Sequence, residues 1–306
     1  MHYTLHQLKI FLKVSENQSI TKAAEEMFLT QPAISIQLKK LQEQFELPLT
    51  EVIGRQLYTT DFGLEIAARC RKILEEADAI RYTIDQYKGL LSGKIKISVV
   101  STGKYVIPYF LKSFMDQHPR VEISIDVSNK NKVIEGLVRN EHDFSLVSVL
   151  PEGIQVNAIE LMDNRLYLVG ERDHPTKVKK PKDLEKVTLL FREEGSATRI
   201  AMERFLDINE ISANKSMELV SNEAVKQAIN AGLGFSIVPL IGLRTALANE
   251  NMQIYPLKGL PITTKWNLIY NKGKKLTPAQ EALTSFINEQ RHEVMMRHFG
   301  WAMEVD

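Results

Sequence analysis

The 306-residue chain has a single cysteine, Cys70, which limits the classes of protein it can belong to. One cysteine cannot form an internal disulfide framework, and it fits a reducing compartment. No apolar run is long enough to span a membrane, and the first residues lack the unbroken apolar core of a signal peptide. We therefore expect a cytoplasmic protein without a membrane partner, which excludes a secreted solute-binding protein.

The sequence also lacks the motifs of common catalytic sites. It contains no GxSxG, Walker A or GxGxxG pattern, and no metal-spaced cysteine–histidine set. His2 and His6 have the spacing of two metal ligands on a helix, but no third ligand lies nearby. We expect no catalytic residue, no metal and no cofactor. An enzyme or solute-binding protein that uses the C-terminal part for a small substrate stays open as the alternative.

Charge gives no indication of a nucleic-acid partner. The net charge is +1, and residues 1–62 contain six Lys or Arg against seven Asp or Glu. This region therefore fails the test of a basic domain, and we expect only modest non-specific affinity for DNA. If this region binds DNA, the binding has to depend on where its few Lys and Arg side chains lie and not on their number.

Residues 30–44, TQPAISIQLKKLQEQ, predict a helix with two distinct faces. Thr30 can cap it, and Pro32 suits the first turn because a missing N–H costs nothing there. Ile34 and Leu38 belong to an apolar stripe at helical spacing. Small and polar residues begin the opposite face and lysines follow one turn later, which suits a helix in the DNA major groove. That face and its flank carry Pro32, Ala33, Ser35, Ile36, Lys39 and Lys40.

A second short helix precedes this one. Ser19 can cap it, and it runs from Ile20 to about Met27, with Ala23 and Ala24 small enough for a close crossing. Two short helices joined by a few residues form a helix-turn-helix. Apolar positions between residues 5 and 14 predict a third helix that completes a small core.

Residues 5–45, LHQLKIFLKVSENQSITKAAEEMFLTQPAISIQLKKLQEQF, resemble the N-terminal domain of LysR-type transcriptional regulators. The blocks ITKAAE and TQPAISIQLKKL carry the resemblance, which extends over almost the whole chain. It implies double-stranded promoter DNA as a partner and RNA polymerase as a further candidate. The DNA-binding residues expected from this resemblance and from the outward helix face are Ser19, Thr21, Thr30, Gln31, Pro32, Ala33, Ser35, Ile36, Lys39, Lys40 and Arg55.

Residues 51–63, EVIGRQLYTTDFG, predict a hairpin with Gly54 and Arg55 at its turn. The resemblance makes this hairpin the wing of a winged helix-turn-helix, with Arg55 near a phosphate or the minor groove. A solvated turn arginine is the alternative. Thr50 and Val52 depart from the family, which usually has an aromatic and a basic residue at these positions.

The helix expected from Thr60 to about Leu91 carries a heptad seam, and such a seam needs a partner helix. We expect a homodimer through this seam, assembling further into a homotetramer. The alternative is an amphipathic helix that lies on its own domain. Cys70 on the seam is interpreted as a small hydrophobe, with a redox switch as the other option. The seam consists of Ile66, Cys70, Ile73, Ala77, Ile80, Ile84, Tyr87 and Leu91.

Beyond Gly93, strands and helices alternate, which predicts parallel sheets flanked by helices. Strands are expected at 94–100, 121–128, 143–149, 165–170, 188–191, 217–220, 235–239 and 265–271. The pattern resembles the two-lobed, periplasmic-binding-protein-like effector domain of LysR-type regulators. The fold class is thus α plus α/β. The expected parts are a winged helix-turn-helix domain (1–62), a linker helix (63–91) and an effector domain (93–306) with lobes 93–162 plus 265–306 and 163–264.

Polar residues follow several of these strands or begin helices, where small ligands collect in open α/β sheets. The resemblance places these segments in the cleft between the lobes. Helix capping is the alternative role for each Ser, Thr and Asn. The expected effector-binding residues are Ser101, Thr102, Lys104, Ser128, Asn129, Lys130, Ser148, Arg192, Gly195, Ser196, Thr198, Arg199 and Asn222.

Four of these residues, Lys104, Lys130, Arg192 and Arg199, would suit an anionic effector unless they are merely solvated. STGKYVIPYFLKSF and REEGSATR look similar to the family branch that regulates Rubisco and carbon-fixation operons. Members of that branch respond to phosphorylated metabolites or NADPH. The apolar C-terminal tail, residues 291–306, is expected to pack on its own domain or against another subunit.

Overall fold

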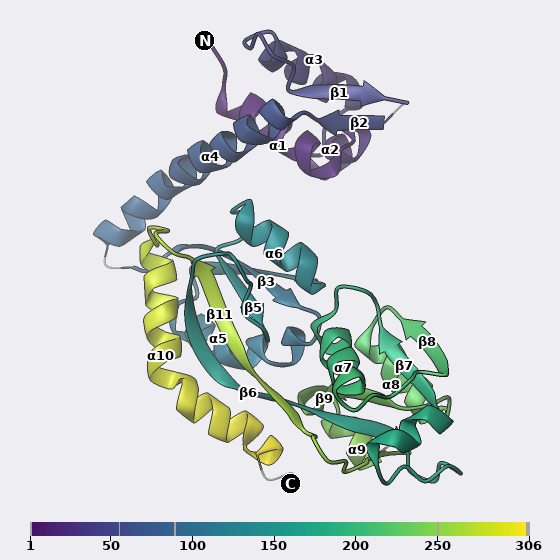
Figure 1. Cartoon of the computed structure of the whole chain (residues 1–306). Coiled ribbons are helices and arrows are strands. Elements are labelled where there is room, and N and C mark those ends of the chain that lie inside the picture. The colour runs from purple at the N-terminus through teal and green to yellow at the C-terminus, as the bar shows by residue number, and fades with distance from the viewer. Residues whose placement is uncertain (1, 55, 89, 250, 304–306) are drawn as a thin grey trace. The chain divides into compact units, whose positions relative to one another are not determined.

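The computed structural model describes residues 2–54, 56–88, 90–249 and 251–303, without the side chains of 81, 83–86 and 249. The chain divides into two compact units, Met1–Leu91 and Ser92–Asp306, whose elements are labelled in Figure 1. Among the helices described, none combines the length and the apolar character that crossing a membrane requires.

The first unit has the predicted winged helix-turn-helix order. Its elements are α1 (Leu5–Asn17), α2 (Ile20–Glu26), α3 (Gln31–Gln42), β1 (Thr50–Ile53), β2 (Gln56–Thr59) and α4 (Asp61–Tyr87). The two strands pair antiparallel, from Thr50 opposite Thr59 to Ile53 opposite Gln56. The linker helix α4 therefore ends four residues before the predicted Leu91.

One apolar cluster holds the first unit together. Phe11, Ile34 and Leu41 are completely buried in it, and Ala23 in α2 is equally inaccessible where α2 meets α3. At the start of α4, a Cβ on Gly63 would lie 2.0 Å from the Leu49 carbonyl oxygen. Only a glycine lets α4 approach the strand entry this closely, so this residue fixes where the linker helix leaves the domain.

Helix caps in this unit follow the prediction in two cases and depart from it in one. The Ser19 hydroxyl accepts from the Lys22 N–H at 3.3 Å, and the Thr60 hydroxyl accepts from the Gly63 N–H at 2.9 Å. Thr30 occupies the N-cap position of α3 but makes no capping hydrogen bond with its side chain. The capping role predicted for Thr30 is therefore wrong, and its hydroxyl stays on the exposed surface.

The second unit is an α/β domain with two lobes. Its elements, in chain order, are β3 (Gly93–Val100), η1 (Gly103–Tyr105), α5 (Ile107–Gln117), β4 (Val121–Ser128), α6 (Lys130–Val138), β5 (Phe144–Val147), β6 (Val156–Glu171), η2 (Pro181–Lys186), β7 (Thr188–Arg192), α7 (Ala197–Ile208), β8 (Lys215–Leu219), α8 (Asn222–Asn230), β9 (Ser236–Pro239), η3 (Leu240–Gly242), α9 (Arg244–Asn249), β10 (Met252–Ile254), β11 (Ile262–Asn271), α10 (Pro278–Phe299) and η4 (Gly300–Ala302).

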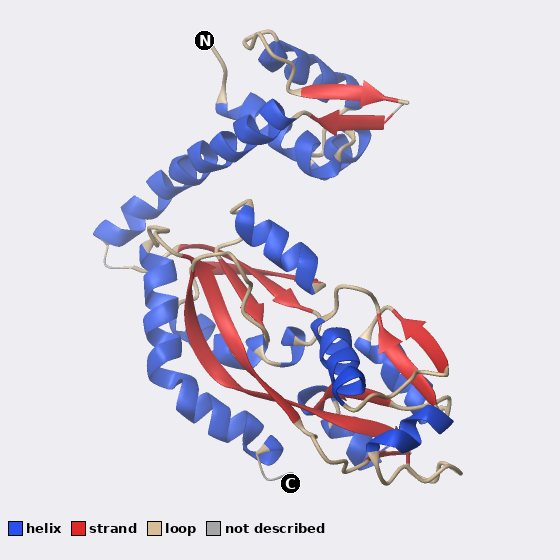
Figure 2. Cartoon of the chain, viewed as in Figure 1, coloured by secondary structure: helices blue, strands red, loops and turns tan. Residues whose placement is uncertain are grey.

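A seven-stranded sheet runs through both lobes in the order β10-β6-β11-β5-β3-β4, with β9 also paired to β6. In the first lobe, α5 and α10 pack together on one side while α6 packs on β3, β5 and β11, as Figure 2 shows. In the second lobe, β7 and β8 form a separate parallel pair. The parallel pairs β3–β4 and β3–β5 agree with the predicted βαβ units.

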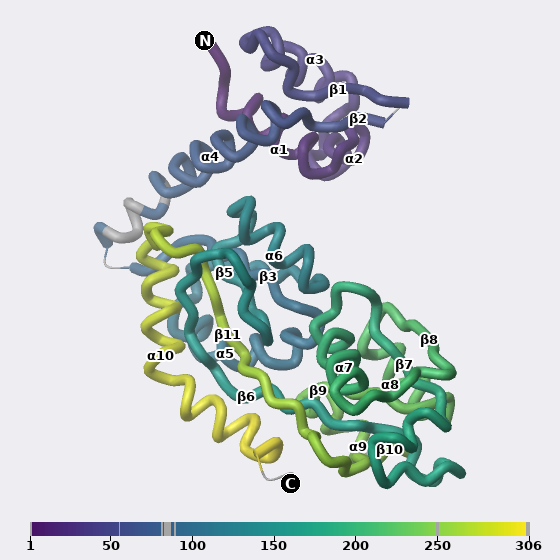
Figure 3. Tube along the Cα trace, in the orientation of Figure 1, coloured from purple at the N-terminus to yellow at the C-terminus, as the bar shows by residue number. Residues whose placement is uncertain are grey.

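The strand predicted at 165–170 is wrong in extent. β6 begins at Val156, nine residues earlier. The prediction missed this first part because Glu160, Asp163 and Asn164 interrupt the apolar pattern by which a strand is recognised. β6 pairs antiparallel with β11 from Val156 to Leu166, and the two strands run side by side in Figure 3. Both predicted lobe limits, 162/163 and 264/265, fall inside these strands, so the lobes share one continuous backbone ladder.

Candidate functional site

Within the first unit, the face of α3 that points away from the apolar core is exposed to solvent. Ile34 and Leu38 point into the core, whereas Lys39 and Lys40 lie on the opposite, exposed face. Small and polar residues occupy the first turn of this face, as predicted. Thr30, Gln31, Pro32 and Ile36 are exposed, and Ala33 and Ser35 are partly buried on its flank.

The two lysines on this face carry charges that the described part of the protein leaves uncompensated. Neither Lys39 nor Lys40 forms an ion pair with any residue that the structure describes, whereas Lys13 is held by Glu16 and Glu26, each at 3.1 Å. Burial of the apolar stripe thus turns both lysines outward. This arrangement can neutralise phosphates despite the acidic balance of the domain.

Sequence reasoning missed an aromatic residue beside α3. Phe28 lies in the turn between α2 and α3, in a left-handed conformation with φ of 55°, and is 95% exposed. A turn between two short helices is expected to serve only as a connector, but a phenylalanine is an unusual residue for a solvated turn and was the available signal. At the start of α2, Thr21 is exposed near the Ser19 cap, as the resemblance implies.

The hairpin that forms the wing is exposed at its tip. Val52 and Ile53 in β1 are 69% and 59% exposed, and Gly54 has φ of +57°, which opens the turn. Arg55 lies outside the described residues, so its contact with DNA stays a prediction. The described residues beside the turn therefore expose apolar side chains to solvent.

The heptad seam on α4 divides into two parts. Cys70 is 2% exposed and packs in the first unit's own core, with Ile66 against the same cluster. The placement of Cys70 on a free dimer seam is therefore wrong, because α1 covers that part of α4. Further along, Ile73, Ile80 and Tyr87 are 40%, 69% and 91% exposed. Ala77 and Leu91 are partly buried, and the Ile84 side chain lies outside the described residues.

In the second unit, Arg192 lies at the centre of a polar cluster between the lobes. It ends β7, is 3% exposed, and its Nη2 donates to the Ser101 Oγ at 3.1 Å across the cleft. Its Nη1 donates to the Asn222 Oδ1, and the Asn222 Nδ2 donates to the same Ser101 hydroxyl at 3.0 Å. One guanidinium thus joins a loop of the first lobe to the start of α8 in the second.

A small cavity of about 10 Å³ adjoins Arg192, with room for roughly one water molecule. Seven of the predicted effector-binding residues line it, so the structure brings distant segments together as expected. They are Ser101, Thr102, Asn129, Lys130, Arg192, Ser196 and Thr198. A cavity of this volume is too small for a metabolite, so an effector would fit there only if the walls moved apart.

Capping explains some of these polar residues but not all of them. The Asn129 Oδ1 accepts from the Lys132 N–H at 3.0 Å, so Asn129 caps α6. Ser196 is the N-cap residue of α7 but makes no capping bond with its side chain and is 6% exposed. Ser196, Ala197 and Thr198 line the cavity at the start of α7, where no side-chain cap occupies the first N–H groups, and such a helix start suits an anion.

Other predicted residues lie away from the cavity. Arg199 donates to Glu203 and Glu218 and to the Arg192 carbonyl oxygen, so its charge is already compensated. Lys104 faces Glu223 at 3.9 Å. Both side chains thus have acidic partners in this arrangement, and the anion contacts expected of Arg199 and Lys104 stay predictions. Ser128 ends β4 and the buried Ser148 follows β5, and both lie outside the lining. Gly195 lies against Asn131 with φ of +79°.

Two carboxylates of the cleft were not predicted. Glu193 accepts from Arg192 and lines the cavity. Glu223 accepts from the Tyr105 hydroxyl, which joins η1 to α8 across the lobes. Burial, and then the neighbouring Glu223 carboxylate, raises the pKa of Tyr105 well above its usual range, so the hydroxyl remains a donor. The prediction considered only cationic side chains that could bind an anion, so it missed the two glutamates that pair with Arg192 and Lys104.

The exposed α3 face, the wing and a two-lobed α/β domain with a polar cleft define a bacterial regulator of the LysR type. Residues 5–64 match the family described as bacterial regulatory helix-turn-helix protein, lysR family, and residues 88–291 match the LysR substrate binding domain. The chain belongs to the LysR family of transcriptional regulators.

Two curated proteins of similar sequence match nearly the whole chain. The chain is 34% identical to the HTH-type transcriptional activator CmpR of Synechocystis over 93% of this chain and 94% of that protein. It is 36% identical to the RuBisCO operon transcriptional regulator of Acidithiobacillus ferrooxidans, over 94% of both chains. The resemblance to carbon-fixation regulators is thereby confirmed.

A solved structure is similar to the second unit. The regulatory domain of CcmR from Synechocystis PCC6803, in complex with 2-PG, is 30% identical with a TM-score of 0.62. The match covers 65% of this chain and 97% of that domain.

Proposed function

We propose that this LysR-type regulator binds promoter DNA through α3 and the wing, and that a small anionic metabolite in the Arg192 cleft modulates this binding. The observation that carries the proposal is the buried guanidinium of Arg192, shared by Ser101 and Asn222 from opposite lobes. A cation removed from water needs strong acceptors around it. Glu193 supplies one in this structure, and the oxygens of an anionic ligand would supply another.

The chemistry of the effector follows from the groups around the cavity. Ser196, Thr198 and the first N–H groups of α7 add neutral donors to the Arg192 charge, and Lys130 adds a second cation at the rim. Donors of this kind suit phosphate or carboxylate oxygens. The complex of CcmR with 2-PG supports the same ligand class here, and 2-PG is the effector we propose to test first.

The regulator is proposed to act as a homodimer through α4, and to assemble further into a homotetramer. Ile73, Ile80 and Tyr87 form an exposed apolar stripe on this helix, and such a stripe is stable when a second helix covers it. Two copies of α3 then address two half-sites on one duplex. RNA polymerase is a further proposed partner at the promoter.

The test is binding of 2-PG and DNA by the full chain. Calorimetry should show 2-PG binding that Arg192→Gln weakens at least roughly tenfold, because the variant removes a charge-assisted hydrogen bond. Arg204→Gln, which removes an exposed arginine of α7 outside the cavity, is the matched control. Gel shifts with DNA from upstream of the chain's own gene should be salt-sensitive and should change when 2-PG is added.

Two results would count against this proposal. If 2-PG bound equally well to the Arg192 and Arg204 variants, the cleft would not be the effector site. If no sequence-specific retardation occurred at low salt, the exposed α3 face would not be a promoter-binding surface, and the small-substrate alternative would be favoured.

A further inference from the structure

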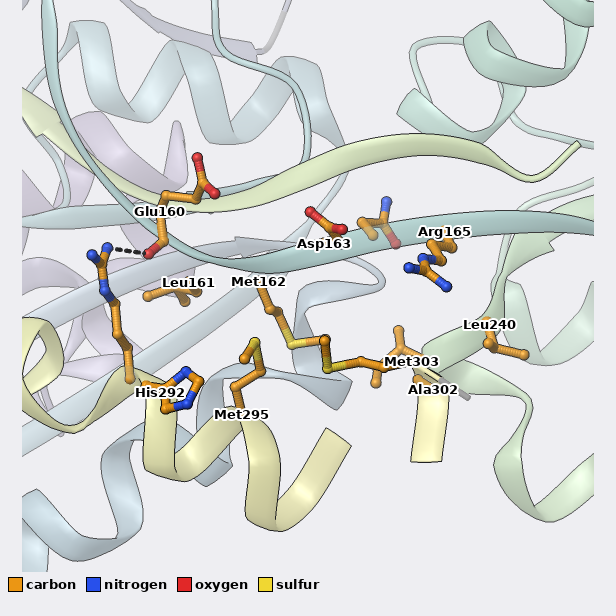
Figure 4. A pocket seen from close by; sticks show the side chains of 13 residues that line it. Glu160, Leu161, Met162, Asp163, Arg165, Leu240, His292, Met295, Ala302 and Met303 are labelled. Carbon is orange, nitrogen blue, oxygen red and sulfur yellow. Dashed lines mark hydrogen bonds between the residues drawn. The ribbon is translucent and has the colours of Figure 1, made fainter. Parts of the chain in front are cut away.

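A second, larger cavity of about 440 Å³ lies between β6 and the C-terminal helix and shares no lining residue with the Arg192 cleft. Its volume falls within the range of small-molecule sites in proteins. Figure 4 shows it from close by. The lining residues are Glu160, Leu161, Met162, Asp163, Asn164, Arg165, Leu240, Ile241, Arg291, His292, Met295, Ala302 and Met303.

Methionines form the apolar part of this cavity. Met162 from β6, Met295 from α10 and Met303 after η4 gather there, and Met162 and Met303 point toward one another in Figure 4. Leu161 and Leu240 extend the same apolar wall. Thioether side chains are flexible and polarisable, so this lining can adapt to the shape of a flat or branched apolar group.

The charges around the cavity leave an excess of one positive charge. Arg165 has no hydrogen bond or ion pair with any described residue, and Arg291 donates only to the Glu160 carbonyl oxygen, at 2.8 Å, among the described residues. The Glu160 carboxylate is paired with Lys265 outside the lining. Of the described lining residues, Asp163 is then the one acidic side chain left to oppose the two guanidinium groups of Arg165 and Arg291.

A buried amide at the cavity wall also lacks part of its hydrogen bonding. Asn164 is 4% exposed, and its Nδ2 donates to the Thr264 hydroxyl at 3.0 Å. Its Oδ1 is buried and accepts no hydrogen bond from the described residues. A buried acceptor without a donor is costly, so this oxygen calls for a partner that the described residues do not supply.

Both lobes contribute to the walls. Leu240 and Ile241 belong to η3 of the second lobe, whereas Met295 belongs to the helix that packs on the first. The chain end holds the two together: Phe299 is buried against Phe110 of the first lobe, and Trp301 packs on the apolar cluster of the second. This confirms the prediction that the tail packs on its own domain.

We propose that this cavity binds an amphipathic organic monoanion, with its apolar body among the methionines and its carboxylate on Arg165. Such a ligand matches the volume, the flexible apolar lining and the single excess positive charge. Because its walls come from both lobes, an occupant has different contacts in different lobe arrangements. That condition allows the cavity to be coupled to the Arg192 cleft, with each ligand changing the affinity for the other.

The probe for this site is 1-naphthylacetate, and its neutral amide is the matched compound. In the full chain labelled at its methionine methyl groups, the acid should shift the NMR signals of Met162, Met295 and Met303. Met115 and Met217, which do not line the cavity, should stay unshifted. The acid should bind roughly tenfold or more tightly than the amide, because only the acid can form a charge-assisted bond with Arg165.

Variants separate this site from the effector cleft. Arg165→Gln should remove the preference for the acid over the amide, whereas Arg297→Gln, an exposed arginine of α10 outside the lining, should keep it. Arg192→Gln should leave the preference for the acid over the amide intact, because Arg192 does not line this cavity. Equal affinities for acid and amide, methyl shifts confined to other methionines, no binding at millimolar concentration, or loss of the acid preference in the Arg192 variant would each overturn the proposal.

Discussion

Arg192 and Glu193 are consecutive residues whose side chains form a two-pronged ion pair in the cleft that we propose as the effector site. The Arg192 Nε and Nη2 donate to the two carboxylate oxygens of Glu193, both at 2.8 Å. Glu193 therefore occupies the guanidinium edge that an incoming carboxylate or phosphate would use. In this structure, the Glu193 carboxylate takes the position beside Arg192 that the carboxylate or phosphate of a ligand would take.

Replacing Glu193 by Gln should strengthen the binding of an anionic effector. The variant removes a competing negative charge while keeping the size of the side chain, and we expect the affinity for 2-PG to rise roughly tenfold. Calorimetry with the full chain measures the change. Glu194→Gln, which alters the next residue along the chain, is the control, and an equal rise in both variants would show only a general effect of charge.

Substitutions on α3 should separate base reading from phosphate binding. Gln31→Ala or Ser35→Ala should weaken specific binding by about 1–3 kcal/mol for each hydrogen bond to a base that the variant removes, and should leave non-specific binding intact. Lys39→Ala should weaken both kinds of binding and lower the salt slope by about one unit. Gel shifts over a range of salt report both quantities, with Lys9→Ala, an exposed lysine on α1, as the control. Unchanged non-specific binding by the Lys39 variant would contradict its phosphate role.

Gly63→Ala should destabilise the DNA-binding unit. The new Cβ would lie 2.0 Å from the Leu49 carbonyl oxygen, so α4 must shift, at a cost of about 1–3 kcal/mol. Hydrogen exchange of residues 5–62 in the full chain measures the loss of stability. Gly300→Ala is the matched control, because its Cβ would meet nothing within 4 Å and its φ of −51° is helical. Equal protection in both variants would show that the close approach at Leu49 is not a constraint.

Cys70 should be unreactive in the folded chain. Burial raises the pKa of its thiol to about 11, so at pH 8 the thiolate fraction is on the order of one in a thousand, and the side chain is 2% exposed. Iodoacetamide at pH 8 should label the chain only after unfolding in urea. Rapid labelling of the native protein would instead support the redox alternative.

Ile80→Asp should weaken the dimer that we propose. Ile80 is 69% exposed on α4, and a carboxylate there cannot be buried between two helices without a large desolvation cost. Sedimentation should show a shift toward monomer, and Lys72→Glu, an exposed residue off the seam, should not cause it. An unchanged association state in the Ile80 variant would place the interface elsewhere.

Secondary-structure elements were predicted correctly where the apolar residues of a short stretch are also the residues that are buried in the fold. Helix α3 and strands β3 and β4 lie where apolar periodicity placed them. Ser101, Arg192 and Asn222 also meet as expected, because strand ends and helix starts converge in an α/β sheet. These features depend on short stretches of chain and on topology.

The features that the sequence did not predict depend on tertiary contacts. The first half of β6 was not predicted because acidic and amide side chains interrupt its apolar pattern. Cys70 fits a heptad seam by spacing, but α1 covers it, and spacing carries no information about which neighbour packs there. The Glu193 contact required knowing that the Arg192 fork turns back on its own neighbour.

The shared strands β6 and β11 constrain how the effector cleft opens. Two lobes connected only by flexible loops could rotate freely. Here the lobes are connected by the hydrogen-bonded strands β6 and β11, so a change in the angle between the lobes must twist this strand pair. The register shift between Trp266 and Asn267 is where such a strand pair yields most easily. A change in the angle between the lobes therefore has to bend two hydrogen-bonded strands together, which favours small movements over a free hinge.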